Sequence, residues 1–173
     1  MVICSKGLGR VKWLGWRNYM LTSKKLTDDQ RKQSAPVRIK RGAIEENVPG
    51  ADLVVSPWHH IFIDDVLVRA NDLINGQTHV QEMDVKQVAY FHIELDQFDV
   101  VRAHGVFSES WVYGGNRDFF ENADVTSLRP EDMKRRLADR PGFTVLRDKI
   151  KIKGIQNRLL QRALSISGEE KTA

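Results

Sequence analysis

The chain has 173 residues, of which 41% are hydrophobic and 29% are charged, and its formal net charge is +4. This length and composition are ordinary for a globular protein with one full core, and the chain is short for two independent domains. No run of 18 or more apolar residues is present, which excludes a helical membrane span, and a single cysteine excludes an internal disulfide and a cysteine-based zinc cluster.

The charge is strongly segregated along the sequence. Residues 1–41 contain eleven Lys/Arg and two Asp/Glu, residues 42–129 contain five and fifteen, and residues 130–173 contain eleven and six. Because no basic stretch is interleaved with aromatic residues, the sequence does not favour nucleic-acid binding. The basic ends are expected either to lie against the acidic middle or to be solvated.

Nothing at the N-terminus resembles a Sec signal peptide, because residues 1–7 lack an apolar segment of the required length. A chain with one cysteine and no such leader is expected in a reducing compartment. The sequence therefore predicts a cytoplasmic protein, with export by another route left open.

The first half of the sequence alternates strand-like and turn-like segments. Period-two alternation predicts strands over residues 11–17 and 36–40, while the polar residues 22–35 between them predict an exposed loop. Two further apolar runs, residues 53–55 and 60–63, are typical of strands.

Turn residues divide the segments that follow. Asp64-Asp65 predicts a tight turn into a strand over residues 66–68, and Asn75-Gly76 is a second hairpin signal. Residues 87–94 and 100–102 are expected to pair as strands. Together these patterns predict a mainly β, antiparallel body.

Beyond residues 109–113, which continue the β pattern, the sequence becomes helical. Asn116 can cap a short helix through Phe120, and residues 130–139 begin with proline and acidic residues, as helices often do. From Gly154, apolar residues at helical spacing predict an amphipathic helix: Ile155, Leu159, Leu160, Ala163 and Leu164. We therefore expect a β domain over residues 1–122 and a basic helical C-terminal extension over residues 123–173.

Two histidine-containing segments carry most of the chemical information. Ser56-Pro57-Trp58-His59 sets a hydroxyl and an imidazole three positions apart between two apolar runs, and Phe91-His92-Ile93-Glu94-Leu95-Asp96 embeds another imidazole among strand formers. Glu109-Ser110-Trp111 and residues 115–120 follow. Taken together, these segments resemble the bacterial branch of the Hint (hedgehog/intein) family over about residues 8–122.

Hint domains cleave or splice their own backbone, through attack of an N-terminal Cys or Ser on the preceding carbonyl. The resemblance implies a Hint-like antiparallel β body with no cofactor. It also implies that Ser56 hydrogen-bonds the strained scissile unit, that His59 protonates the departing nitrogen and that His92 assists.

The sequence departs from the family where the nucleophile is expected. The family opens with Cys-Phe-x-x-Gly-Thr, far ahead of a Trp-x-Gly segment that corresponds here to residues 13–15. Cys4 lies at a position that the family does not use for attack, and we expect it to be a free thiol at a frayed terminus. Phe98 stands where a histidine is usual, and no C-terminal His-Asn pair is present for asparagine cyclisation. The resemblance therefore implies a Hint-type fold that is incomplete at the N-terminus.

Structural interpretations compete with the catalytic ones. A histidine among strand residues is often a packed core residue, and this reading stays open for His59 and His92. His60 is expected to point to the opposite face and to have a structural role. Because no two histidines have helical i, i+4 spacing, no metal site is predicted.

Three functions remain open. The first is a truncated or degenerate autoprocessing domain that is inactive alone. The second is a non-catalytic β scaffold or binding module whose basic tail docks an acidic partner. The third is a half-domain that works with a separate N-terminal Hint fragment. The expected partner is accordingly that fragment or the chain's own N-terminal flanking polypeptide.

Overall fold

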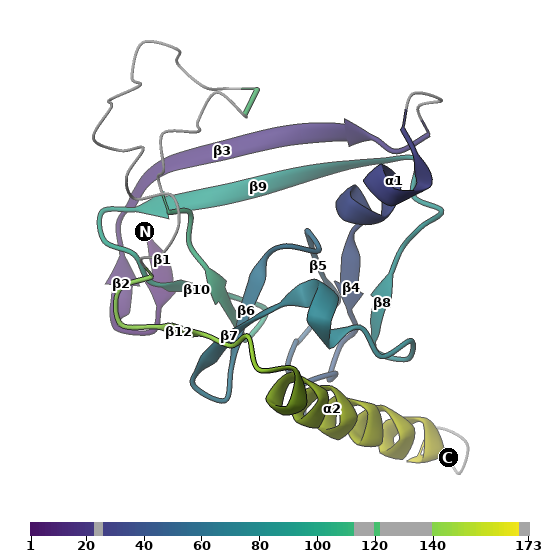
Figure 1. The fold of residues 1–173 in the computed structure, drawn as a ribbon. Coiled ribbons are helices and arrows are strands. Elements are labelled where there is room, and N and C mark those ends of the chain that lie inside the picture. Colours follow the sequence, from purple (N-terminus) through teal and green to yellow (C-terminus); the bar gives the residue numbers. More distant parts are fainter. Residues whose placement is uncertain (23–25, 113–119, 122–139, 170–173) are drawn as a thin grey trace.

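The structure, a computed structural model, describes residues 1–22, 26–112, 120–121 and 140–169. Within these residues it contains twelve β-strands and two α-helices, which confirms the predicted mainly β fold (Figure 1). The helices predicted near residues 116–120 and over residues 130–139 lie largely outside the described residues.

The largest sheet has seven strands in the order β12-β7-β6-β11-β10-β1-β2, and only β12 and β7 are parallel neighbours. The predicted strands over residues 60–63 and 66–68 are confirmed and form a hairpin. Its turn residues, Asp64 and Asp65, both have positive φ, a conformation that Asp tolerates well. The seven strands are β1 (Val2–Cys4), β2 (Gly7–Gly9), β6 (His60–Ile63), β7 (Val66–Arg69), β10 (Val100–Ala103), β11 (Val106–Glu109) and β12 (Thr144–Val145).

Two smaller sheets complete the β structure. β3 (Val11–Met20) and β9 (Gln87–Leu95) form a long antiparallel ribbon across the top of the view in Figure 1. β4 (Val37–Ile39) lies between β5 (Leu53–Val55) and β8 (His79–Gln81). The strands predicted at the positions of β3, β4 and β5 are thus confirmed.

Two predicted pairings are wrong. β9 pairs with β3 rather than with β10, which lies between β1 and β11. Asn75-Gly76 does not form a hairpin: Asn75 Oδ1 accepts hydrogen bonds from the backbone N–H groups of Gln77, Thr78 and His79, and β8 then pairs with β4. Alternation identifies a strand but carries no information about its partner, which can lie far away in the sequence.

The ends of the β body also differ from expectation. β11 ends at Glu109, and among the described residues that follow it, 110–112, the only β pairing is a single bridge from Trp111 to Glu94. Cys4 is not frayed: it lies in β1 opposite Val101 and is buried. Pairing with β10, which is distant in sequence, orders this short strand.

The polar segment 22–35, predicted as a loop, contains helix α1 (Asp28–Ser34). The Gln30 N–H donates to Thr27 Oγ1, and the Thr27 N–H donates to the Gln30 side chain. This capping box stabilises the first turn. The helix buries none of its side chains, so hydrophobic periodicity could not reveal it.

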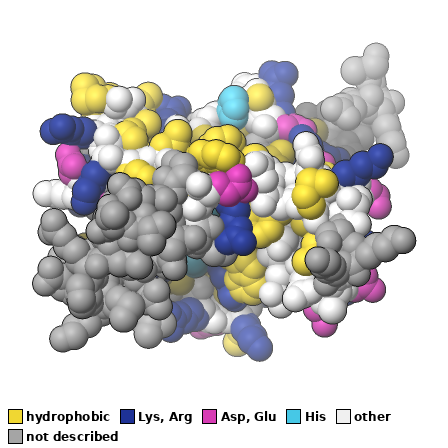
Figure 2. All heavy atoms as spheres, turned by 90° about the horizontal axis from the view of Figure 1, so that it is seen from above, with side chains coloured by type: hydrophobic (Ala, Val, Ile, Leu, Met, Phe, Trp, Pro, Cys, Tyr) yellow, Lys and Arg dark blue, Asp and Glu magenta, His cyan; other side chains and the backbone are white. Residues whose placement is uncertain are grey.

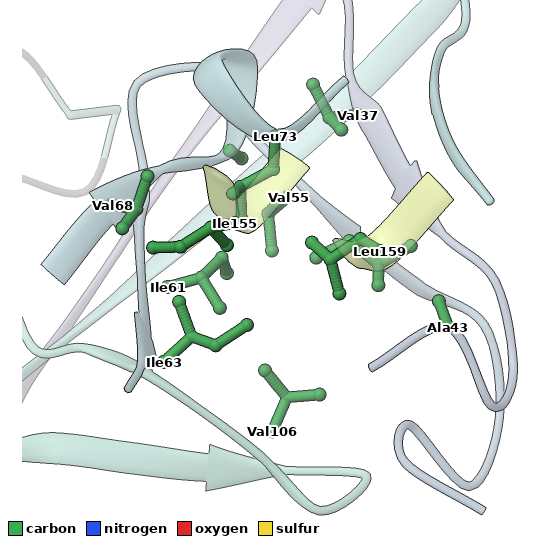
Figure 3. Packing of buried hydrophobic residues seen from close by; sticks show 12 residues of the cluster. Val37, Ala43, Val55, Ile61, Ile63, Val68, Leu73, Val106, Ile155 and Leu159 are labelled. Atoms are coloured by element: carbon green, nitrogen blue, oxygen red, sulfur yellow. The ribbon is translucent and has the colours of Figure 1, made fainter. Parts of the chain in front are cut away.

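Helix α2 (Lys149–Glu169) packs on the main hydrophobic core. Ile155 and Leu159 belong to one buried cluster with side chains of β6, β7 and the 3-10 helix η1 (Ala70–Leu73), as Figure 3 shows. The predicted apolar face of this helix is confirmed for Ile155, Leu159 and Ala163, which are buried, but Leu164 is exposed. The helix starts at Lys149 rather than Gly154. Of the helices in the described part of the chain, none has the length and apolar character needed to cross a membrane.

The variant Leu159→Ala should lower the free energy of unfolding by about 2–5 kcal/mol, because truncating a core leucine leaves a cavity. Leu159 is 1% exposed, whereas Leu164 on the same helix is 51% exposed. Leu164→Ala is therefore the matched control and should cost about 0.5 kcal/mol or less. Equilibrium urea unfolding measures both values, and equal losses would contradict the packing of α2 on the core.

Candidate active site

Ser56 and His59 lie in the turn that joins β5 to β6. The His59 N–H donates to the Ser56 carbonyl oxygen at 3.1 Å, which closes the turn. The carbonyl oxygens of Pro57 and His59 accept hydrogen bonds from the N–H groups of Asn71 (2.9 Å) and Ala70 (2.8 Å) in η1. The turn is therefore fixed by the strands that precede and follow it, β5 and β6, and by the hydrogen bonds of its carbonyl oxygens to η1.

His92 lies in β9, opposite Gly15 of β3. A Cβ atom at position 15 would clash with the ring of Trp13 and would lie 3.0 Å from Cδ1 of Phe120. Only glycine therefore lets the Trp13 ring lie over this point of the ribbon. The local sequence Trp13-Leu14-Gly15 thus fits a close approach of aromatic rings beside His92.

His92 is surrounded by rings. Its ring centroid lies 4.9 Å from that of Trp111 and 5.4 Å from that of Phe120, both in edge-on arrangements. Phe120 in turn contacts Trp13 at 5.0 Å and Trp111 at 4.9 Å. Such edge-to-face packing is favourable and fixes ring orientation.

The structure brings His59 and His92 together. Their ring centroids are 5.6 Å apart, with an interplanar angle of 51°, although His59 lies in the β5–β6 turn and His92 lies in β9. Ser56 is joined to His59 through the backbone turn, and its half-buried hydroxyl makes no hydrogen bond with any described residue. Two of the three predicted site residues therefore make direct ring contact, and the third, Ser56, lies in the same turn as His59.

Burial controls the charge of both rings. Removal from water lowers the pKa of His59, and the nearby positive charges of His60 and Arg140 lower it further, against an opposing effect of Glu109. Burial likewise lowers the pKa of His92 to about 4, and His59 adds to that effect. Both imidazoles are therefore neutral at pH 7. A neutral imidazole can accept a proton at one nitrogen while it donates from the other.

His60 points into a different environment from His59. Its Nδ1 lies 2.6 Å from Oε1 of Glu109, and Oε2 of Glu109 accepts a hydrogen bond from Arg140 Nε at 2.6 Å. Burial raises the pKa of the Glu109 carboxyl, but the hydrogen bonds from His60 and Arg140 and the charge of the two nearby histidines outweigh this and hold its pKa at about 2. The predicted separation of His59 from His60 is confirmed by these different contacts. Local sequence patterns did not predict that Glu109 and Arg140 contact His60, because 49 and 80 positions separate them from it.

Comparison with known proteins gives one match. A family model for the Hint domain matches residues 1–115, a range that includes Ser56, His59 and His92. Neither the search of curated proteins nor the search of solved structures found a significant match. Because the family model covers well over half of the 173 residues, the chain belongs to the Hint domain family.

Proposed function

We propose that this chain is a degenerate or divided autoprocessing domain of the Hint type that is inactive alone. Ser56, His59 and His92 form its site, and the attacking residue is supplied by polypeptide outside these 173 residues. The observation that carries the proposal is the contact between the His59 and His92 rings, 5.6 Å apart, in a site whose burial keeps both neutral.

The chemistry requires a group that moves a proton. When a thiol or hydroxyl attacks the carbonyl carbon of the preceding peptide bond, a C–S or C–O bond forms and the C–N bond breaks. The nucleophile loses its proton, and the departing nitrogen must gain one. A neutral imidazole at His59 can do both in turn, while His92 positions the His59 ring through their contact.

Ser56 is suited to hold the scissile unit. Its hydroxyl has no hydrogen-bond partner among the described residues, so one donor and its acceptor lone pairs are available to a peptide group. The turn fixes the distance of this hydroxyl from the His59 backbone. The Ser56 hydroxyl can therefore hydrogen-bond a substrate peptide near the His59 ring, which transfers the proton.

Cys4 is unsuited to be the nucleophile. It packs with Leu95 and Val101 in a small cluster that contains no residue of the proposed site. Burial and the negative charge of Asp99 raise the pKa of its thiol, which disfavours the reactive thiolate. The sequence also contains no Cys-Phe-x-x-Gly-Thr segment.

A non-catalytic binding module is the second candidate. Leu14, Met20 and Phe91 of the β3–β9 ribbon are 46%, 57% and 60% exposed. Figure 2 looks down on this ribbon and shows hydrophobic side chains gathered along that face. Exposed apolar surface of this kind often marks a contact with another polypeptide.

The deciding experiment restores the missing segment. A tag followed by an opening segment with Cys-Phe-x-x-Gly-Thr is placed ahead of Met1, and cleavage at the tag–Cys bond is followed by gel electrophoresis with and without thiol. We expect thiol-dependent cleavage that slows by about 100-fold or more in His59→Ala. The control is His104→Asn, because His104 is exposed and its positive φ is tolerated by Asn.

Two results would contradict this proposal. One is equal cleavage with and without His59 in variants whose circular dichroism matches the parent. The other is cleavage of a tag fused directly to Met1, because the chain would then need no added segment. A folded chimera that never cleaves would favour the binding module.

The ring of His92 should titrate with a midpoint near pH 4 in NMR spectra, with His92→Asn assigning the signal, because burial lowers its pKa to about 4. The unfolded chain, with an ordinary histidine pKa of about 6.5, takes up this proton first. The contribution of His92 to stability is therefore present above about pH 6.5 and is lost as the pH falls towards 4. A midpoint above about pH 6 would contradict a neutral site at pH 7.

A further inference from the structure

A cleft of about 650 Å³ is lined by residues of β7, η1, β12 and the first turns of α2. In Figure 1 these elements lie below the β3–β9 ribbon. This volume is within the usual range of small-molecule sites. Five cationic side chains line it, with a single carboxylate: Arg69, Arg140, Arg147, Lys149, Lys153 and Asp72.

Two of these cations are already neutralised. Arg69 Nε pairs with Asp72 Oδ2 at 2.9 Å, and Arg140 Nε pairs with Glu109 at 2.6 Å. Three are not. Among the described residues, Arg147 and Lys149 have no ion-pair partner, and the Lys153 ammonium group donates only to the neutral Gln156 side chain, at 2.7 Å.

The walls of the cleft are held in place by the fold. β12 pairs with β7, and the Leu146 N–H continues this pairing to the Leu67 carbonyl oxygen at 2.9 Å. The side-chain amide of Gln156 donates to the carbonyl of Ile74 and ties α2 to the end of η1. Arg147 and Lys149 therefore flank the cleft on a fixed backbone.

The positive charge of the cleft comes from side chains rather than from the end of the helix. Asp148 Oδ1 accepts hydrogen bonds from the N–H groups of Ile150 (2.8 Å) and Lys151 (3.2 Å) at the start of α2. These backbone donors are thus occupied by the chain's own carboxylate. Like charges that converge in a concave site repel one another, and an anionic ligand relieves that repulsion.

His60 adds a polar group to the same cleft. Its ring lines the cleft, and its Nδ1 hydrogen-bonds to the ionised Glu109 carboxylate. Leu146 and Ile152 supply an apolar lining and pack against the main core. The cleft therefore combines three unneutralised cations, the polar ring of His60 and an apolar wall.

We propose that this cleft binds a small polyanion with two or more phosphate or carboxylate groups. Arg147, Lys149 and Lys153 contact its negative charges. The inference rests on the cleft alone and is independent of any autoprocessing activity. Arginine binds phosphate and carboxylate groups bidentately, and lysine binds them as a point charge.

The test is calorimetric titration of the full chain with two probes, inorganic pyrophosphate and citrate, at about 50 mM salt. Binding of either probe is expected, and the preferred probe tells phosphate from carboxylate recognition. The double variant Lys149→Gln/Lys153→Gln should bind about tenfold or more weakly. Both lysines are exposed, so their replacement should leave the melting temperature unchanged.

Lys151→Gln is the matched control, because Lys151 lies on α2 between the two lysines, is exposed and does not line the cleft. Its affinity for the probes should change by about twofold or less. The proposal is overturned if neither probe binds at about 10 mM, or if Lys151→Gln weakens binding as much as the double variant does. The second result would show diffuse attraction to the basic helix.

Discussion

The pairing of β3 with β9 is the constraint on which the candidate site depends. It joins segments on either side of α1 and the three-stranded sheet, and it sets His92 opposite Gly15. The absence of a side chain at Gly15 admits the Trp13 ring, which packs on Phe120, and Phe120 contacts His92. The orientation of one histidine ring is thus fixed by backbone pairing that spans most of the β body.

Two adjacent histidines, His59 at the end of the β5–β6 turn and His60 at the start of β6, lie in different chemical environments. His59 joins His92 in a site where burial keeps the imidazole neutral, whereas His60 joins the ionised Glu109 and Arg140. Successive side chains of a strand point in opposite directions, so a shift of one residue in the register of β6 would exchange the two environments. The pairing of β6 with β7 and β11 prevents that shift.

Local patterns in the sequence predicted the elements but not their partners. Alternation identified residues 11–17 and 53–55 as strands, and helical spacing identified the buried face of α2. The Ser56 and His59 pair was recognisable because it lies within one turn. The contact of His59 with His92, and that of Glu109 with Arg140, depend on sheet pairing over long sequence distances. No periodicity in a single sequence encodes such pairing.

The position of α2 has a consequence for the order in which the protein can fold during synthesis. Ile155 and Leu159 belong to the same buried cluster as Val37 and Ile61, so the core unites an early and a late part of the chain. A nascent chain that leaves the ribosome with its N-terminus first carries uncovered apolar faces until this helix emerges. The final step of core formation is therefore delayed until the helix has been translated. Until then, the growing polypeptide exposes apolar surface that the folded protein buries.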